Sequence, residues 1–143
     1  MRYLLLALLF SNTVFAYDDK MSDDPCGFTR IQIANHTSDI CKISTKEIIH
    51  GAVAGSTSIP NNILPGDSKI FIMEQYYGVE VNLNYQCGYN SLHFKVQRPF
   101  YMFSASEITF NVIDSKGLKA SYIKDDGSCF WGVSGDIDVN LFN

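Results

Sequence analysis

Alternation of apolar and polar residues is the feature that most restricts how this chain can fold. In "YGVEVNLNYQCG" (77–88), apolar residues and then a cysteine occupy every second position from Val79 to Cys87. A period of two is typical of a β-strand with one buried face and one solvated face. Alternation or a short apolar run also marks the segments 30–35, 41–44, 69–74, 91–97, 107–113, 118–124, 129–133 and 136–143.

Turn-forming sequences separate these segments, as in "NHTSD", "PGD", "CGYN", "DSKG", "DDGS" and "SGD". About eight or nine short strands without a helical period predict an all-β fold, a single antiparallel β-sandwich or a barrel-like variant of it. The irregular segment 51–65 is expected to cross from one sheet to the other. Asn35 also begins the sequon Asn-His-Thr, which matters only in a eukaryotic secretory pathway.

The first residues have the pattern of a secretory signal peptide. Arg2 precedes an apolar run at 4–10, and small residues flank Phe15 before Ala16. The run is shorter than the roughly 20 residues that span a membrane; a buried N-terminal helix is the alternative. We therefore predict a signal peptide at 1–16, an acidic flexible leader at 17–25 and the β-sandwich domain at 26–143, in a secreted or periplasmic protein.

The four cysteines predict a disulfide-stapled domain. An even number in an exported chain is typical of disulfides, and the spacing lacks the CxxC pattern usual in zinc sites. Cys41 and Cys87 lie on inward faces of their strands. The first two strands are expected to form a hairpin turning near Thr37, which would keep Cys26 far from Cys41. We predict the pairs Cys41–Cys87 and Cys26–Cys129.

Motifs for catalysis and nucleic-acid binding are missing from the sequence. The net charge is −4 and no run of Lys or Arg occurs, which disfavours nucleic acid as a partner. Nucleophile-elbow, P-loop, zinc-protease and dinucleotide motifs are absent. His36, His50 and His93 are expected at the surface, and turn chemistry explains the acids at 125–127 and 135–138 better than calcium binding does. We expect that the protein is not an enzyme and that it binds no cofactor and no metal.

Aromatic residues gather in three connections, at 75–78, 98–103 and 128–132. These follow the third, fifth and seventh expected strands. In an all-antiparallel domain, odd-numbered connections lie at one end, together with the connection at 35–39. The predicted binding surface, here called the aromatic rim, consists of Tyr76, Tyr77, Phe100, Tyr101, Met102, Phe103, Phe130 and Trp131.

The aromatic rim has two interpretations. Its side chains can plug the end of the sandwich as part of the core. Alternatively, they are exposed and form a binding surface, because aromatic rings at loop tips suit lipid headgroup regions, sugar faces and protein partners. Met102 would add an adaptable apolar contact.

The sequence resembles small exported β-proteins of intracellular gammaproteobacteria and, more distantly, aegerolysin-like sandwiches. The resemblance rests on an I-x-I-x-N strand (31–35), the Pro65-Gly66 turn, a Gly-led strand (78–85) and a G-x-x-G element (132–135). It covers roughly residues 28–142. The aegerolysin family binds membrane lipids, and some members recruit a pore-forming partner. The export signal, the two disulfides and the single Trp depart from that family.

The predicted function is a non-catalytic recognition module that binds a lipid surface through the aromatic rim. One alternative is a module that binds a glycan, or binds or inhibits another protein, for which a sheet edge would also serve. The other is a small hydrolase with a dispersed site. A pocket with a histidine beside a carboxylate would favour the hydrolase.

Overall fold

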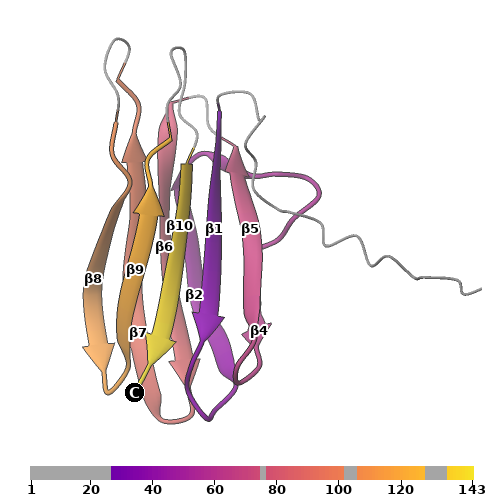
Figure 1. Cartoon of the computed structure of the whole chain (residues 1–143), viewed down its shortest axis with the longest axis vertical. Coiled ribbons are helices and arrows are strands. Elements are labelled where there is room, and N and C mark those ends of the chain that lie inside the picture. Colours follow the sequence, from indigo (N-terminus) through magenta and orange to yellow (C-terminus); the bar gives the residue numbers. More distant parts are fainter. Residues whose placement is uncertain (1–26, 75–76, 102–105, 128–134) are drawn as a thin grey trace, which may run out of the picture.

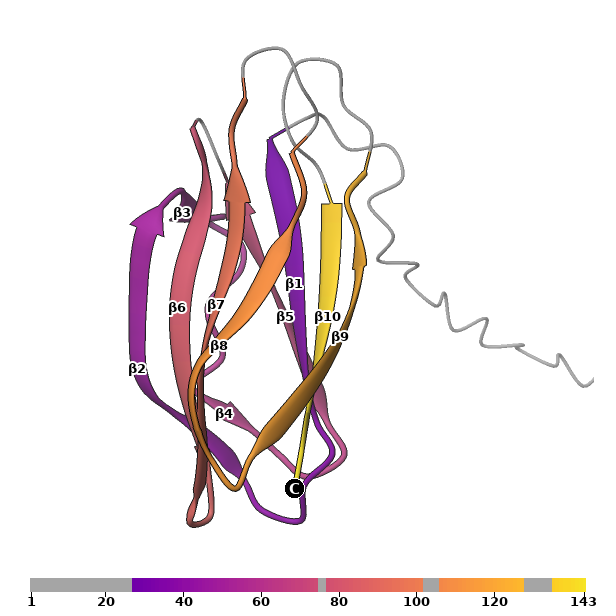
Figure 2. The ribbon, with the colours of Figure 1, turned by 90° about the vertical axis from the view of Figure 1, so that its left-hand side faces the viewer.

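The structure, a computed structural model, describes residues 27–74, 77–101, 106–127 and 135–143. Two five-stranded sheets pack face to face (Figures 1 and 2), which confirms the β-sandwich. Sheet A contains, in spatial order, β3 (Ala52–Val53), β5 (Ser68–Glu74), β1 (Phe28–Asn35), β10 (Gly135–Phe142) and β9 (Lys119–Asp125). Sheet B contains β4 (Asn62–Ile63), β2 (Cys41–His50), β6 (Gly78–Cys87), β7 (Asn90–Pro99) and β8 (Thr109–Lys116).

The predicted inward faces of β1, β6, β7 and β10 form the core between the sheets, whereas the predicted inward residues Val112 of β8 and Tyr122 of β9 are exposed. Burial alternates along β1, β6, β7 and β10, as the period of two requires. Ile31 and Val139 of sheet A and Leu83 and Phe94 of sheet B are fully buried in this core. The two additional strands, β3 and β4, have two residues each and lie within the segment that was expected to be irregular.

One pair of strands is parallel, where an all-antiparallel domain was expected. β1 and β10 run side by side in the same direction, with Thr29 opposite Gly135. The reason is the segment between β2 and β5. It pairs with Glu74 through β3 at one end of the sandwich and with Cys41 through β4 at the other, so it makes one additional passage along the molecule.

Because of this additional passage, the predicted position of the connection at 35–39 is wrong. The start of β1 lies beside the end of β5, because Phe28 pairs with Glu74. The connection after β1 is therefore at the opposite end from the ends of β5, β7 and β9. We call the end where β5, β7 and β9 finish the rim end, and the opposite one the disulfide end (Figure 1).

The disulfide Cys41–Cys87 is present, although the predicted hairpin of the first two strands is wrong. β1 belongs to sheet A and β2 to sheet B, so they do not pair. Instead β2 pairs with β6, and Cys41 lies directly opposite Cys87 with their Cα atoms 4.1 Å apart. Cys26 and Cys129 lie outside the described residues, so the second disulfide stays a prediction.

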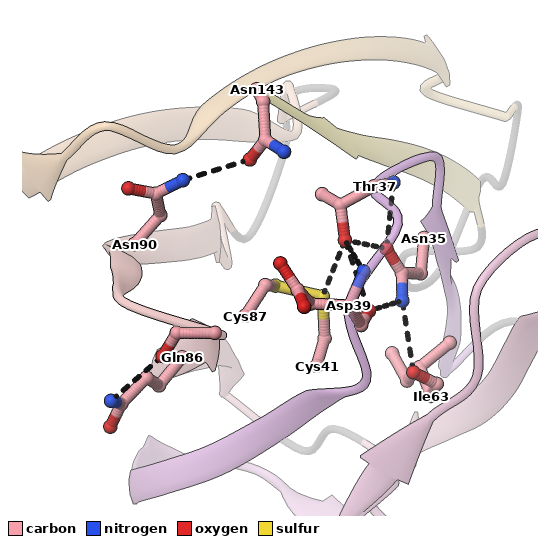
Figure 3. Close-up of a disulfide and its surroundings, with 10 residues drawn as sticks. Asn35, Thr37, Asp39, Cys41, Ile63, Gln86, Cys87, Asn90 and Asn143 are labelled. Carbon is pink, nitrogen blue, oxygen red and sulfur yellow. Dashed lines mark hydrogen bonds between the residues drawn. A yellow bond between two sulfur atoms is a disulfide. The ribbon is translucent and has the colours of Figure 1, made fainter.

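Asn35 organises the disulfide end (Figure 3). Its side chain is fully buried, and its amide nitrogen donates to the backbone oxygens of Asp39, at 2.8 Å, and Ile63, at 3.0 Å. Its amide oxygen accepts hydrogen bonds from the backbone nitrogen of Thr37, at 2.9 Å, and from the Thr37 hydroxyl, at 2.8 Å. The asparagine of the sequon is thus a structural residue of the folded domain.

The predicted signal peptide and leader lie outside the described residues and stay predictions. Within the described part of the chain, no helix is long and apolar enough to cross a membrane.

Candidate functional site

Three members of the aromatic rim, Tyr77, Phe100 and Tyr101, are described, and all three lie at the rim end. The Tyr77 side chain is 82% exposed and that of Tyr101 is 55% exposed. Phe100 is half-buried, and its ring meets that of Tyr77 edge to face with centroids 6.3 Å apart. The other members, Tyr76, Met102, Phe103, Phe130 and Trp131, lie outside the described residues.

The pairing of β6 with β7 brings Tyr77 and Phe100 together. Gly78 lies opposite Pro99, and its φ of +101° is a conformation that residues with a side chain rarely adopt. A Cβ atom at this position would lie 2.7 Å from the backbone oxygen of Arg98. Glycine therefore lets β6 begin in close contact with β7, and this places the two rings side by side.

Arg98 is the residue of this site that sequence reasoning missed. It is the last inward position of β7 and only 3% exposed. Its Nε donates to the Ser106 hydroxyl at 3.2 Å, and its Nη2 donates to the backbone oxygens of Ser106, at 3.1 Å, and Asp126. Ser106 follows 102–105 and Asp126 precedes 128–134, so one side chain holds the bases of two of the three aromatic connections.

The charge on Arg98 survives its burial. Burial lowers the pKa of Arg98, whereas the nearby charges of Asp126 and Asp125 raise it. A guanidinium does not lose its proton in proteins, so the hydrogen bonds that it donates are charge-assisted. Gly135 provides the space for this side chain, because a Cβ atom there would collide with Nη1 of Arg98.

Asp126 forms a second link beside Arg98. Its Oδ1 accepts a 2.7 Å hydrogen bond from the backbone nitrogen of Ile108, and its Oδ2 lies 3.1 Å from Nζ of Lys124. Burial opposes ionisation of Asp126, but these partners outweigh it and lower the pKa of Asp126. Lys124 also pairs with Glu107 at 3.5 Å. The cations of this end are thus partnered by carboxylates or carbonyl groups.

The predicted surface positions of the histidines agree with the structure only in part. His50 is exposed at the end of β2, whereas His93 is half-buried on the outward face of β7. The ring of the exposed His36 lies 3.0 Å from the Asn140 side-chain oxygen, which belongs to an amide and not to a carboxylate. Across the described ranges, no three His, Cys, Asp or Glu side chains are close enough to hold a metal ion.

Two hollows are lined by residues within the described part of the chain. One of about 670 Å³ lies at the disulfide end, where Asp39, Lys42 and Gln86 are among its lining residues. The other, of about 370 Å³, is lined by Lys46 and Ile48 of β2 and by residues 57–59. Neither lining contains a histidine, so neither provides the histidine and carboxylate pair that would favour a hydrolase.

Comparison with known proteins supports the fold. No protein-family model matches the sequence, and no curated protein matches it. The lipid-binding protein Nakanori has a similar structure, with a TM-score of 0.63 and 10% identity over 87% of this chain and 75% of that chain. Protein IP-1A from Alcaligenes faecalis is also similar, with a TM-score of 0.55 and 15% identity over 81% of this chain and 90% of that chain.

Proposed function

We propose that this protein is a non-catalytic recognition module that binds a lipid surface through the aromatic rim. The observation that carries the proposal is Tyr77, whose ring is 82% exposed beside Phe100 and Tyr101 at one end of the sandwich. A fold shared with a lipid-binding protein supports it. The exposure of Tyr77 and Tyr101 favours a binding surface over a plug of the core for these two side chains.

Burial of only a few aromatic rings is enough for attachment to a lipid surface. Burying about 100 Å² of an aromatic side chain contributes roughly 2.5 kcal/mol. Two or three rings would therefore suffice for reversible attachment, comparable to that of a single acyl chain. Tyr77 and Tyr101 provide two, and the rim residues outside the described ranges would add to them.

The anchored bases of the connections support the same proposal. A binding surface gains affinity when its side chains lose little conformational freedom on binding. Arg98 fixes Ser106 and Asp126, and the pairing of Gly78 with Pro99 fixes the backbone beside Tyr77. Attachment should depend weakly on salt, because Lys124 is already paired with carboxylates.

Co-sedimentation with vesicles of zwitterionic phosphatidylcholine, with and without an anionic lipid, tests the proposal. We expect Tyr77→Ala, Tyr101→Ala and Trp131→Ala each to weaken binding by roughly 60-fold, which corresponds to the loss of about 2.5 kcal/mol. Tyr89→Ala is the matched control, because Tyr89 is 92% exposed in the β6–β7 turn at the disulfide end. This variant should bind as the wild type does.

Two results would count against the aromatic rim as a binding surface. Loss of folding in all three rim variants, measured by circular dichroism and thermal unfolding, would show that the rings belong to the core. If the rim variants fold and bind vesicles like the wild type, lipid binds elsewhere on the protein. If neither the wild type nor the variants bind vesicles, lipid binding is excluded. A glycan array with the same variants then tests the glycan alternative.

We also propose that the chain is exported and that residues 1–16 are removed. The Cys41–Cys87 disulfide supports a secreted or periplasmic location, since disulfides persist in oxidising compartments. The intact mass of the exported protein should correspond to a chain that begins at Tyr17. A mass that retains the first 16 residues would contradict the predicted cleavage.

A further inference from the structure

The outer edge of β9 differs from the other sheet edges. Among the described residues, only β10 pairs with β9, and its register runs without interruption from Lys119 to Asp125. In sheet B, register shifts interrupt both β8 and β2, and such bulges hinder pairing with a further strand. In sheet A, β3 covers the end of β5. The edge of β9 is thus regular, and no other described strand pairs with it.

Exposed apolar side chains accompany this edge. Ile123 on β9 is 72% exposed, and Tyr122, which lies on the opposite face of the strand, is also exposed. Val112 and Ile113 of β8, which precedes β9 in the chain and belongs to sheet B, are also exposed. β8 and β9 lie on the same side of the sandwich and diverge from their shared turn (Figure 2). An exposed apolar side chain on an open strand edge, such as Ile123, is typical of an interaction surface.

The sequence of β9 is complementary to itself. When a second β9 runs antiparallel about a two-fold axis at Tyr122, all seven residues pair and Lys119 lies opposite Asp125 at both ends. Two residues that face each other in such a pair have their side chains on the same face of the sheet. A shift of the register by one position would pair opposite faces, so the nearest alternative registers differ by two positions. A shift of two places Lys119 opposite either Ile123 or Gly127 and loses both charge pairs.

We propose that β9 is a dimerisation edge, which pairs with β9 of a second copy and joins the two A sheets into one continuous sheet. The contact of Tyr122 with Phe110, at 5.0 Å between ring centroids, holds the central residue of the interface in place. Because the paired strands are antiparallel, the rim ends of the two copies point in opposite directions. The dimer does not depend on what the rim binds.

Sedimentation velocity of the full chain, as recovered from the cells that express it, tests the dimer over a range of concentrations. We expect the wild type to dimerise with rising concentration. Lys119→Glu and Asp125→Lys should each be monomeric, since each puts like charges together twice. An equimolar mixture of the two variants should form a heterodimer, because every facing pair in it is again of opposite charge. Lys46→Glu, on exposed β2, is the control and should dimerise like the wild type.

Ile123→Lys is a second variant, because Asp125→Lys also removes the carboxylate that accepts a hydrogen bond from the backbone nitrogen of Gly127. Ile123 faces solvent, so this variant should fold and remain monomeric. The proposal is overturned if the wild type stays monomeric up to about 1 mM, which would leave the edge to a strand from a different protein. It is also overturned if Lys119→Glu and Ile123→Lys dimerise like the wild type.

Discussion

Arg98, at the end of β7, donates a hydrogen bond to the backbone oxygen of Asp126, which follows β9, and so joins the two sheets at the rim end. The guanidinium is buried where an apolar side chain would continue the inward face of the strand. A buried charge is costly unless its hydrogen bonds are satisfied, so the positions of its partners are closely restricted.

Replacing Arg98 should therefore destabilise the domain. We expect Arg98→Met, which keeps the volume and removes the donors, to lower the free energy of unfolding by about 2–4 kcal/mol. Arg30→Met is the matched control, because Arg30 faces outward and pairs with a half-exposed Asp138. Its cost should be at most about 1 kcal/mol. Urea unfolding of both variants measures the difference, and equal losses would contradict the structural role of Arg98.

Asp126 should contribute stability that acid removes. Its pKa is lowered in the folded state, so its contribution is complete above the ordinary value of 3.8 and is lost as the pH falls through the folded-state pKa. At pH 7 we expect Asp126→Asn to cost about 1 kcal/mol. The gap between variant and wild type should narrow below pH 3.8. Urea unfolding at several pH values measures the difference in free energy of unfolding between Asp126→Asn and the wild type. A difference independent of pH would contradict a stabilising role for the ionised Asp126 carboxylate.

Removing the Cys41–Cys87 disulfide should cost about 2–5 kcal/mol, because the bridge closes a loop between residues 46 positions apart. The double variant Cys41→Ala/Cys87→Ala tests this by urea unfolding. Peptide mapping without reduction tests the second predicted bridge and should recover a Cys26–Cys129 peptide. Free thiols at Cys26 and Cys129 would contradict that pairing.

Asn35 should stabilise the folded domain and should carry no glycan in the folded protein. Asn35→Ala removes four hydrogen bonds at a buried site and should cost about 2–4 kcal/mol. A glycan on its nitrogen would displace the bonds to Asp39 and Ile63. If the chain is produced through a eukaryotic secretory pathway, intact mass should show folded protein without a glycan at this sequon. A folded, glycosylated chain would contradict the buried position.

The strands and their faces could be predicted because alternation is a local property. Each strand of the core shows which side chains it buries without reference to its neighbours, and the inward cysteines gave the right disulfide. The pairing of strands is not local. The additional passage between His50 and Ser68 carries little alternation, so its effect on the direction of every later strand could not be counted from the sequence.

Arg98 shows a second limit of the same reasoning. It continues the inward series of Leu92, Phe94 and Val96, so the period of two did mark it. Because Arg98 is charged, a position exposed to solvent would be expected for it. Only the folded arrangement brings Ser106 and Asp126 close enough to be its hydrogen-bond partners. The aromatic rim was predicted partly from a strand count that placed 35–39 at the wrong end. Its three connections leave the ends of β5, β7 and β9. These strand ends lie at one end of the sandwich because the chain alternates direction regularly from β5 onward.

The parallel pair of β1 and β10 has a consequence for how the chain reaches this fold. The first and last strands are central in sheet A, and Arg30 bonds Asp138 across 108 positions of sequence. Contacts so distant in sequence slow folding, because a long loop must close before they form. A chain emerging from a ribosome or a translocation channel cannot complete sheet A until β10 is free. We therefore expect truncation before β10 to leave β1 and β9 without their shared neighbour, and the domain to fold as a whole chain or not at all.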